Sequence, residues 1–134
     1  VKTLSIMVRG SADQQVTSQL KQRLASDRYA LVEQQDVIDE KAHANLLVTI
    51  LPLGFNPSAY DAAGVATQYR MVYSGSLSLE RGSGAIWQSG VMQRQGDVYV
   101  TGGPTSIEAS RQRLLDDLRK QWLQDALGRL RSGF

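Results

Sequence analysis

The side chains that most often carry chemistry are scarce in this chain of 134 residues. His43 is the single histidine, and the sequence contains no cysteine. A zinc site or a nucleophilic triad needs further His or Cys partners, so neither is indicated. We interpret His43, which lies between two alanines, as a surface or edge residue without a catalytic role.

Paired carboxylates and a glycine-rich segment are the next candidates. Asp116 and Asp117 are neighbours in an expected helix, where adjacent side chains do not face each other, so a general acid–base pair is not indicated. Gly102-Gly103-Pro104 precedes an expected helix N-terminus, which can bind an anion through backbone N–H groups. It lacks the Lys-Ser/Thr of a phosphate loop, so loop flexibility with helix capping explains it better. We therefore predict no enzyme activity, no metal and no cofactor.

Arginines and tyrosines raise the question of a binding function. The formal net charge is only +2, and the arginines are scattered without interleaved stacking aromatics, so nucleic-acid binding is not predicted. These arginines are Arg9, Arg23, Arg28, Arg81 and Arg94. Four tyrosines, Tyr60, Tyr69, Tyr73 and Tyr99, could line a sugar-binding surface. For Tyr69 and Tyr73, core packing is the simpler interpretation.

A long strand from Gly64 to Glu80 is the segment around which the chain is organised. Apolar residues alternate with polar ones, which predicts one buried and one open face and a bend at Gly75. The expected core face holds Tyr69, Met71, Tyr73, Leu77 and Leu79, and the expected open face holds Gln68, Arg70, Ser74, Ser76 and Ser78. Because most of the polar side chains are small hydroxyls, a second molecule can approach this face closely.

The segment before the long strand predicts a strand–helix–strand unit. Lys2–Val8 alternates as a strand, and a capping box at Ser11–Gln14, with Asp13 in the first turn, begins a helix. Its apolar stripe is Val16, Leu20 and Leu24. A short strand at Tyr29–Val32 and an exposed connection at Glu33–Lys41 follow. Leu46–Leu51 is then apolar almost throughout, which indicates a central strand antiparallel to the long strand.

The connections around the long strand are expected to be irregular, and a helix ends the chain. We predict a loop at Asn56–Gly64, a turn at Gly82–Gly84 and a strand at Ala85–Arg94 whose phase the pattern leaves open. Gln95–Gly103 is expected to be flexible, with an edge pairing at Val98–Val100. A capping box at Thr105–Glu108 begins a long amphipathic helix. Its apolar face comprises Ile107, Leu114, Leu115, Leu118, Trp122, Ala126 and Leu130.

These elements predict one α+β domain over residues 1–134. The expected architecture is a two-layer sandwich with two helices on one face of a mixed, mostly antiparallel four-stranded sheet, in the order β-α-β-β-β-α. A hydrophobic content of 42% and a charged content of 21% are typical of a folded chain. No apolar run is long enough to span a bilayer.

The whole chain resembles the outer-membrane lipopolysaccharide-assembly lipoprotein family. The resemblance is carried by Ala-Asn-Leu-Leu-Val-Thr-Ile from Ala44, by the stretch from Ala59 to Met71, by Ala-Ile-Trp-Gln-Ser-Gly from Ala85, and by the long C-terminal helix. Its most distinctive part is the spacing of Gly64, Tyr69, Arg70 and Met71.

The resemblance implies a non-enzymatic subunit that plugs and supports the large β-barrel translocon inserting lipopolysaccharide into the outer membrane. It further implies a periplasm-facing position and membrane association only through a lipidated N-terminal cysteine, which we expect to precede Val1 in the full-length protein. Contact with the barrel is expected through Gln68, Arg70, Ser74, Ser76 and Ser78, and contact with lipopolysaccharide through Tyr60, Arg94 and Tyr99. Family members that bind lipopolysaccharide use basic loop residues, whereas the corresponding loops here contain Asp61 and Asp97.

Two other function classes are compatible with the order of elements. One is a periplasmic lipoprotein module that activates a peptidoglycan synthase or assembles a secretion channel. The long strand with one polar face disfavours it. The other is an enzyme acting on envelope glycans, which the lack of a nucleophile or acid–base constellation disfavours.

Overall fold

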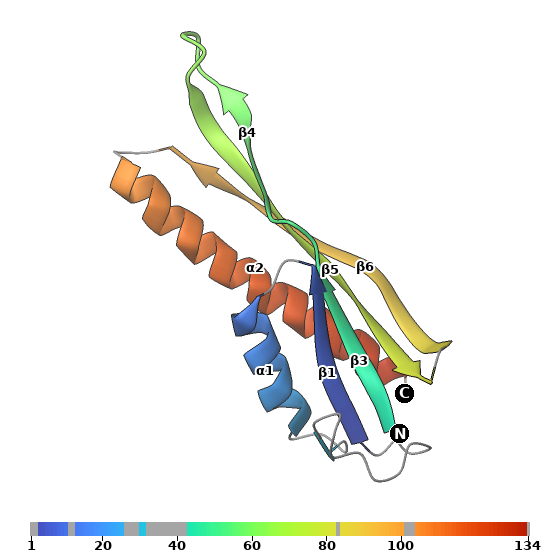
Figure 1. Cartoon of the computed structure of the whole chain (residues 1–134). Coiled ribbons are helices and arrows are strands. Elements are labelled where there is room, and N and C mark those ends of the chain that lie inside the picture. Colours follow the sequence, from blue (N-terminus) through green and yellow to red (C-terminus); the bar gives the residue numbers. More distant parts are fainter. Residues whose placement is uncertain are drawn as a thin grey trace.

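The architecture is a twisted sheet with two helices on one face (Figure 1). The computed structural model describes residues 3–10, 13–25, 30–31, 43–82, 84–100 and 104–133. The strands are β1 (Thr3–Gly10), β2 (Ala30–Leu31), β3 (His43–Ile50), β4 (Gly54–Tyr60), β5 (Ala66–Arg81) and β6 (Gly84–Tyr99). The helices are α1 (Gln14–Ala25) and α2 (Pro104–Gly133).

The sheet is mixed and mostly antiparallel, as predicted, but its described part has six strands rather than four. β2 pairs in parallel with β1, and β1 pairs in parallel with β3. The remaining pairs, in which β5 contacts β3, β4 and β6, are antiparallel. The α+β class and the central antiparallel pair of β3 and β5 are therefore confirmed.

β4 is a strand, and the loop predicted at Asn56–Gly64 is therefore wrong over Asn56–Tyr60. β3 and β4 follow one another along the same edge of β5, because Ile50 pairs with Gly75 and Gly54 pairs with Val72. The interruption between them is short, and the N–H of Leu51 still donates to the carbonyl of Ser74 at 3.0 Å. Pro57 obscured the strand in the sequence, but proline is tolerated on an edge strand whose N–H would face away from the sheet.

β6 is longer than predicted and changes phase along its length. It continues to Tyr99, so the segment Gln95–Tyr99 is a strand and not a flexible stretch. Trp87 pairs with Leu79, and Met92 pairs with Gly75, which places both on the core side although their numbers differ in parity. The reason is a register shift at Ser89–Gly90, where Gly90 has φ 72° and the Oγ of Ser89 accepts the N–H of Leu77 at 2.9 Å.

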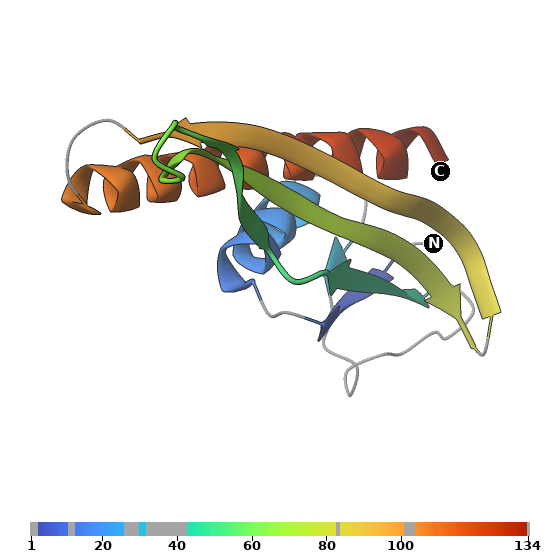
Figure 2. The ribbon, with the colours of Figure 1, turned by 90° about the horizontal axis from the view of Figure 1, so that it is seen from above.

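Both helices cover the face of the sheet that carries the apolar side chains of β5, as predicted. Val16, Leu20 and Leu24 of α1 are buried, and α2 runs along β5 and β6 for much of their length (Figure 2). Met71, Tyr73, Leu77 and Leu79 of β5 are buried with them, whereas Tyr69 is half-buried.

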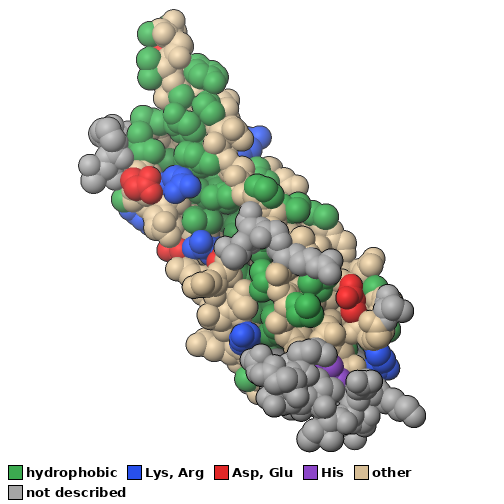
Figure 3. Space-filling view, in the orientation of Figure 1, with side chains coloured by type: hydrophobic (Ala, Val, Ile, Leu, Met, Phe, Trp, Pro, Cys, Tyr) green, Lys and Arg blue, Asp and Glu red, His purple; other side chains and the backbone are tan. Residues whose placement is uncertain are grey.

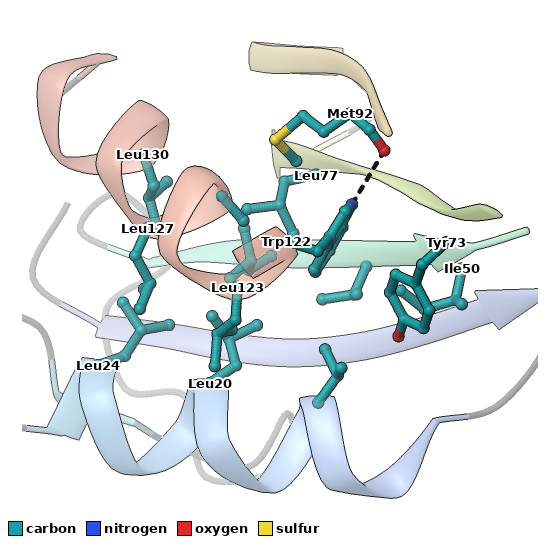
Figure 4. Close-up of a cluster of buried hydrophobic side chains, with 14 of the residues drawn as sticks. Leu20, Leu24, Ile50, Tyr73, Leu77, Met92, Trp122, Leu123, Leu127 and Leu130 are labelled. Carbon is teal, nitrogen blue, oxygen red and sulfur yellow. Dashed lines mark hydrogen bonds between the residues drawn. The ribbon is translucent and has the colours of Figure 1, made fainter. Parts of the chain in front are cut away.

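Trp122 lies at the centre of this core (Figure 4). Its ring is fully buried, and its Nε1–H donates to the carbonyl of Met92 at 3.1 Å. Tyr73 contacts it edge-on at 6.0 Å between ring centroids. Leu123 and Leu127 are also buried, so the core face of α2 is wider than the predicted stripe.

The starts of the two helices differ from the predicted capping boxes. Asp13 precedes α1, and its Oδ1 accepts the N–H of Val16 at 3.2 Å, so Asp13 is the N-cap and not a first-turn residue. α2 begins at Pro104, which suits a first helical position and places Thr105 inside the helix. Ser11, Gly102–Gly103 and Glu33–Lys41 lie outside the described residues.

Candidate functional site

The polar face of β5 comprises Gln68, Arg70, Ser74, Ser76 and Ser78, and we call it the polar ribbon face. Successive side chains of a strand point to opposite sides, so these residues face away from the helices. Ser74 is buried, Gln68, Ser76 and Ser78 are half-buried, and Arg70 is exposed. The face is thus less open than expected, since only Arg70 of the five side chains is exposed.

Residues of β6 extend the polar ribbon face. Their side chains stand opposite those of β5 in register, and most are polar: Gln88, Val91, Gln93, Gln95, Asp97 and Tyr99. The Nε of Arg70 contacts the Oδ1 of Asp97 at 3.3 Å, so the charge of Arg70 is matched within the face. The combined surface is uncharged over most of its length, which favours contact with another polar protein surface over capture of an ion.

The hairpin joining β4 and β5 carries exposed apolar side chains. It projects away from α2 (Figure 1), and hydrophobic side chains gather over this end of the molecule (Figure 3). Tyr60 and Val65 are exposed in the hairpin, and Tyr99 is exposed on β6, where it pairs with Gln68. The carboxylate of Asp61 accepts the N–H groups of Ala63 and Val65 at 2.9 Å each, which orders the turn.

Arg94 is not part of this end. It pairs with Tyr73 in register and therefore points to the helix side of β6, the opposite side from Tyr99. Its Nη2 lies 3.9 Å from the Oδ2 of Asp125 on α2. The structure therefore brings Tyr60 and Tyr99 to one end of the sheet and leaves Arg94 apart from them.

A buried polar cluster of Asp13, Tyr73 and Arg119 was missed by the sequence analysis. The Tyr73 hydroxyl donates to Asp13 Oδ2 at 2.6 Å, and Arg119 Nε donates to the same oxygen at 2.8 Å. Burial would raise the pKa of Asp13, but hydrogen bonds from Tyr73, Arg119 and the Val16 N–H outweigh it and hold this pKa below its ordinary value. Burial and the Asp13 carboxylate raise the pKa of Tyr73. The cluster ties α1, β5 and α2 together.

A cavity of about 250 Å³ adjoins this cluster, lined partly by Ile50, Leu53 and Leu115. Its charged groups, Asp13 and Arg119, already bind each other, and Arg119 Nη1 also donates to Gln15 at 3.0 Å. The cluster therefore serves the packing of the helices rather than a bound ion.

The candidates for chemistry have other contacts. His43 is buried in β3, which lies between β1 and β5, so its interpretation as a surface or edge residue was wrong. Its Nε2 lies 3.1 Å from the Oγ of Ser5. The carboxylates of Asp116 and Asp117 bind different partners, Arg119 and Gln121. The described residues contain no group of His, Cys, Asp and Glu that could hold a metal ion. None of the described helices has the length and apolarity to cross a membrane.

Solved structures share this fold. The rare lipoprotein B of Shewanella oneidensis superimposes with a TM-score of 0.71 at 15% identity, covering 98% of this chain and 95% of that one. A lipoprotein B of Nitrosomonas europaea superimposes with a TM-score of 0.67 at 12% identity, covering 92% of this chain and 77% of that one. A minor lipoprotein of Acinetobacter baumannii superimposes with a TM-score of 0.57 at 15% identity, covering 93% of this chain and 90% of that one.

Sequence comparison identifies the family. No curated protein matches the chain in sequence. The model of the LptE family, described as lipopolysaccharide-assembly, matches residues 1–130. The match covers nearly the whole chain and agrees with the shared fold, so the chain belongs to the LptE family of non-enzymatic lipopolysaccharide-assembly lipoproteins.

Proposed function

We propose that this chain is the outer-membrane lipoprotein subunit that plugs and supports the β-barrel translocon for lipopolysaccharide. Membership of the LptE family implies partnership with the outer-membrane barrel LptD. In this proposal a lipid anchor on the full-length protein holds the domain on the periplasmic side of the outer membrane, and the domain enters the barrel.

The observation that carries the proposal is the polar ribbon face. It is long, because β5 and β6 each span 16 residues. It is nearly uncharged, because Arg70 is matched by Asp97. The interior wall of a wide membrane barrel is polar and often wet, so a slender, polar, uncharged face can lie against it through hydrogen bonds and bridging water.

The proposed contact is tested with Ser76→Arg and, as a matched control, Ser110→Arg on α2. Ser76 lies in the middle of β5, opposite Val91 of β6, whereas Ser110 is a half-buried residue on the helix side. Both changes are expected to leave the free energy of unfolding within about 0.5 kcal/mol, since neither site is in the core. Ser76→Arg places a long cation in a close interface, where an unpaired charge costs several kcal/mol of association.

The measurement is recovery of the barrel with the tagged full-length protein from membranes, together with thermal melting of each variant. We expect Ser76→Arg to lose the barrel and Ser110→Arg to retain it, with similar melting temperatures. If every replacement on the polar ribbon face retains the barrel, this face is only solvated and the proposed contact is wrong.

We further propose that lipopolysaccharide contacts the hairpin end through Tyr60 and Tyr99. Both side chains are exposed, and aromatic rings combine apolar area with a polar hydroxyl, which suits an amphipathic ligand. A phosphate contact by Arg94 remains a prediction from the sequence. It would require the ligand to reach the helix side and to compete with Asp125.

A further inference from the structure

The outer edge of β6 has no strand partner in the described part of the chain. β6 pairs with β5 along one side, and no other described strand adjoins it. Every second residue of an unpaired edge points its N–H and C=O groups outward, where they can pair with another strand. The edge of β6 is therefore a candidate for strand addition.

The direction of each backbone group in β6 follows from the ladder. The N–H of Val100 donates to the carbonyl of Thr67 at 2.9 Å, so Val100 points toward β5. Inward and outward residues alternate along an antiparallel strand, and the register has no shift from Gln68↔Tyr99 to Leu77↔Gly90. The outward residues are therefore Val91, Gln93, Gln95, Asp97 and Tyr99.

This edge lacks several of the features by which natural sheets block strand addition, among them proline, lysine and bulges. From Val91 to Tyr99 the strand contains no proline or lysine, and its register is regular. Its two charged residues form ion pairs: Asp97 pairs with Arg70, and Arg94 pairs with Asp125.

The outer edge of β4 shows the contrast. Ser74 points toward β3, as its hydrogen bond with Leu51 shows, so the even residues of β5 face β4 and Phe55 and Pro57 point outward. Pro57 has no N–H to offer, and two register shifts follow it. The edge of the sheet at β4 is thus blocked, and the edge at β6 is left able to pair.

We infer that the edge from Val91 to Tyr99 pairs with an extended segment of the barrel partner, which adds a strand beside β6. The inference rests on the proposed function for the identity of the partner. It goes further by assigning backbone hydrogen bonds, and not only the side chains of the polar ribbon face, to the interface.

The chemistry of the edge specifies the segment. At about 3.3 Å per residue the edge runs for roughly 30 Å, which a segment of about eight or nine residues matches in extended form. The side chains next to the segment would be Gln93 and Gln95, which are uncharged, and Arg70 and Asp97, whose charges are paired with each other. The partner segment is therefore expected to be extended and mostly uncharged, because an unmatched charge there would lose solvent without gaining a partner.

Hydrogen exchange on the complex tests the pairing directly. The full-length protein is purified from membranes with its barrel, and amide exchange along β6 is compared with that of the free protein. The amides of Gln93, Gln95 and Asp97 are expected to exchange at least about tenfold more slowly in the complex. The amides of Arg94 and Gly96, which already bond to β5, are the internal control and should be protected in both samples.

A pair of variants at one position supplies the second test. Gln95→Pro removes an outward N–H and leaves the ladder with β5 intact, whereas Gln95→Thr keeps the N–H. We expect Gln95→Pro to weaken barrel binding by about tenfold or more, since the lost bond and the crowding of the proline ring act together, and Gln95→Thr to change it by less than about threefold. Circular dichroism of both variants checks that the sheet is retained, which we expect.

The outcomes separate this inference from the proposed function. If the complex forms and the outward amides exchange as fast as in the free protein, the edge pairing is wrong while the barrel partnership stands. Protection of the same amides in the free protein, with a dimer in solution, would assign the edge to a second copy and overturn the inference. If no barrel co-purifies, the proposed function fails and the edge pairing fails with it.

Discussion

Asp13 shows how one residue can connect three elements. It caps α1 through the N–H of Val16, accepts the Tyr73 hydroxyl from β5 and pairs with Arg119 from α2. A buried carboxylate is retained at low cost only when such bonds replace its water. From the sequence, Asp13 is recognisable only as a favourable residue at the start of a helix. Its partners are 60 and 106 residues away, and no local pattern reports such a distant contact.

The first prediction concerns the charge of Asp13. Because the pKa of Asp13 is lowered in the folded state, its stabilising contribution is present above the ordinary value of 3.8 and is lost as the pH falls through the folded pKa. Asp13→Asn should lower the free energy of unfolding at pH 7 by about 1 to 3 kcal/mol. Below about pH 4 the free energy of unfolding should decrease less steeply with falling pH in this variant than in the unchanged protein. Urea unfolding at pH 7 and pH 3 measures this. The exposed Asp117→Asn is the control, and equal effects of the two changes would contradict the role of Asp13.

The second prediction concerns Gly75, where the sheet approaches Trp122 closely. A Cβ built on Gly75 would lie 2.5 Å from the backbone oxygen of Thr49 and 3.0 Å from Trp122 Cζ2, and the backbone oxygen cannot move aside. Gly75→Ala should therefore cost about 1 to 3 kcal/mol of stability. Gly84→Ala meets no atom within 4 Å and should change stability by less than about 1 kcal/mol. Similar unfolding midpoints in urea for the two variants would rule out the close approach as the reason for glycine at position 75.

At the scale of elements, α2 is attached to the sheet through Trp122. Its indole is fully buried and bonded to Met92, so Trp122→Ala should cost about 3 to 5 kcal/mol. Trp122→Phe keeps most of the apolar area and loses the bond to Met92, so its cost should be clearly smaller. Thermal and urea unfolding of the two variants measure the difference. A loss below about 1 kcal/mol for Trp122→Ala would mean that α2 detaches from the sheet, leaving its apolar face for a partner.

Element type followed from periodicity where one face is buried. A buried face leaves a regular spacing of apolar residues in the sequence, as in the stripe of Val16, Leu20 and Leu24 and in the alternation from Met71 to Leu79. For this reason α1, α2 and β5 were predicted correctly. β4 was missed because Pro57 is acceptable only on an edge, and a sequence does not say which strand is an edge. The phase of β6 stayed open because the bulge at Ser89–Gly90 moves the buried side chains from odd to even positions.

At the scale of the whole molecule, the two faces of the sheet have different roles: one carries the packing that stabilises the fold, and the other carries the proposed binding surfaces. The helices and the buried cluster lie on one face, whereas the polar ribbon face and the outer edge of β6 carry the proposed contacts. Changes to the helix side should therefore lower stability first, and changes to the other side should lower partner binding first. The residues of the polar ribbon face were identifiable from alternation alone, but their arrangement beside Gln93, Gln95 and Asp97 required the register of β6.

The last prediction concerns the hairpin end as a ligand-binding end of the molecule. Tyr60 and Tyr99 are 62% and 63% exposed, and Val91, which lies farther along β6, is 64% exposed. If exposed apolar area alone bound lipopolysaccharide, replacing Val91 would weaken binding about as much as replacing Tyr60 or Tyr99. If the ordered hairpin end is the binding site, the double change Tyr60→Ser with Tyr99→Ser should weaken binding of purified lipopolysaccharide by about tenfold, since burying an aromatic side chain contributes on the order of 1.5 to 3 kcal/mol. Val91→Ser should leave binding unchanged. All variants should melt at similar temperatures, and an equal loss of binding for Val91→Ser would contradict a site at the hairpin end.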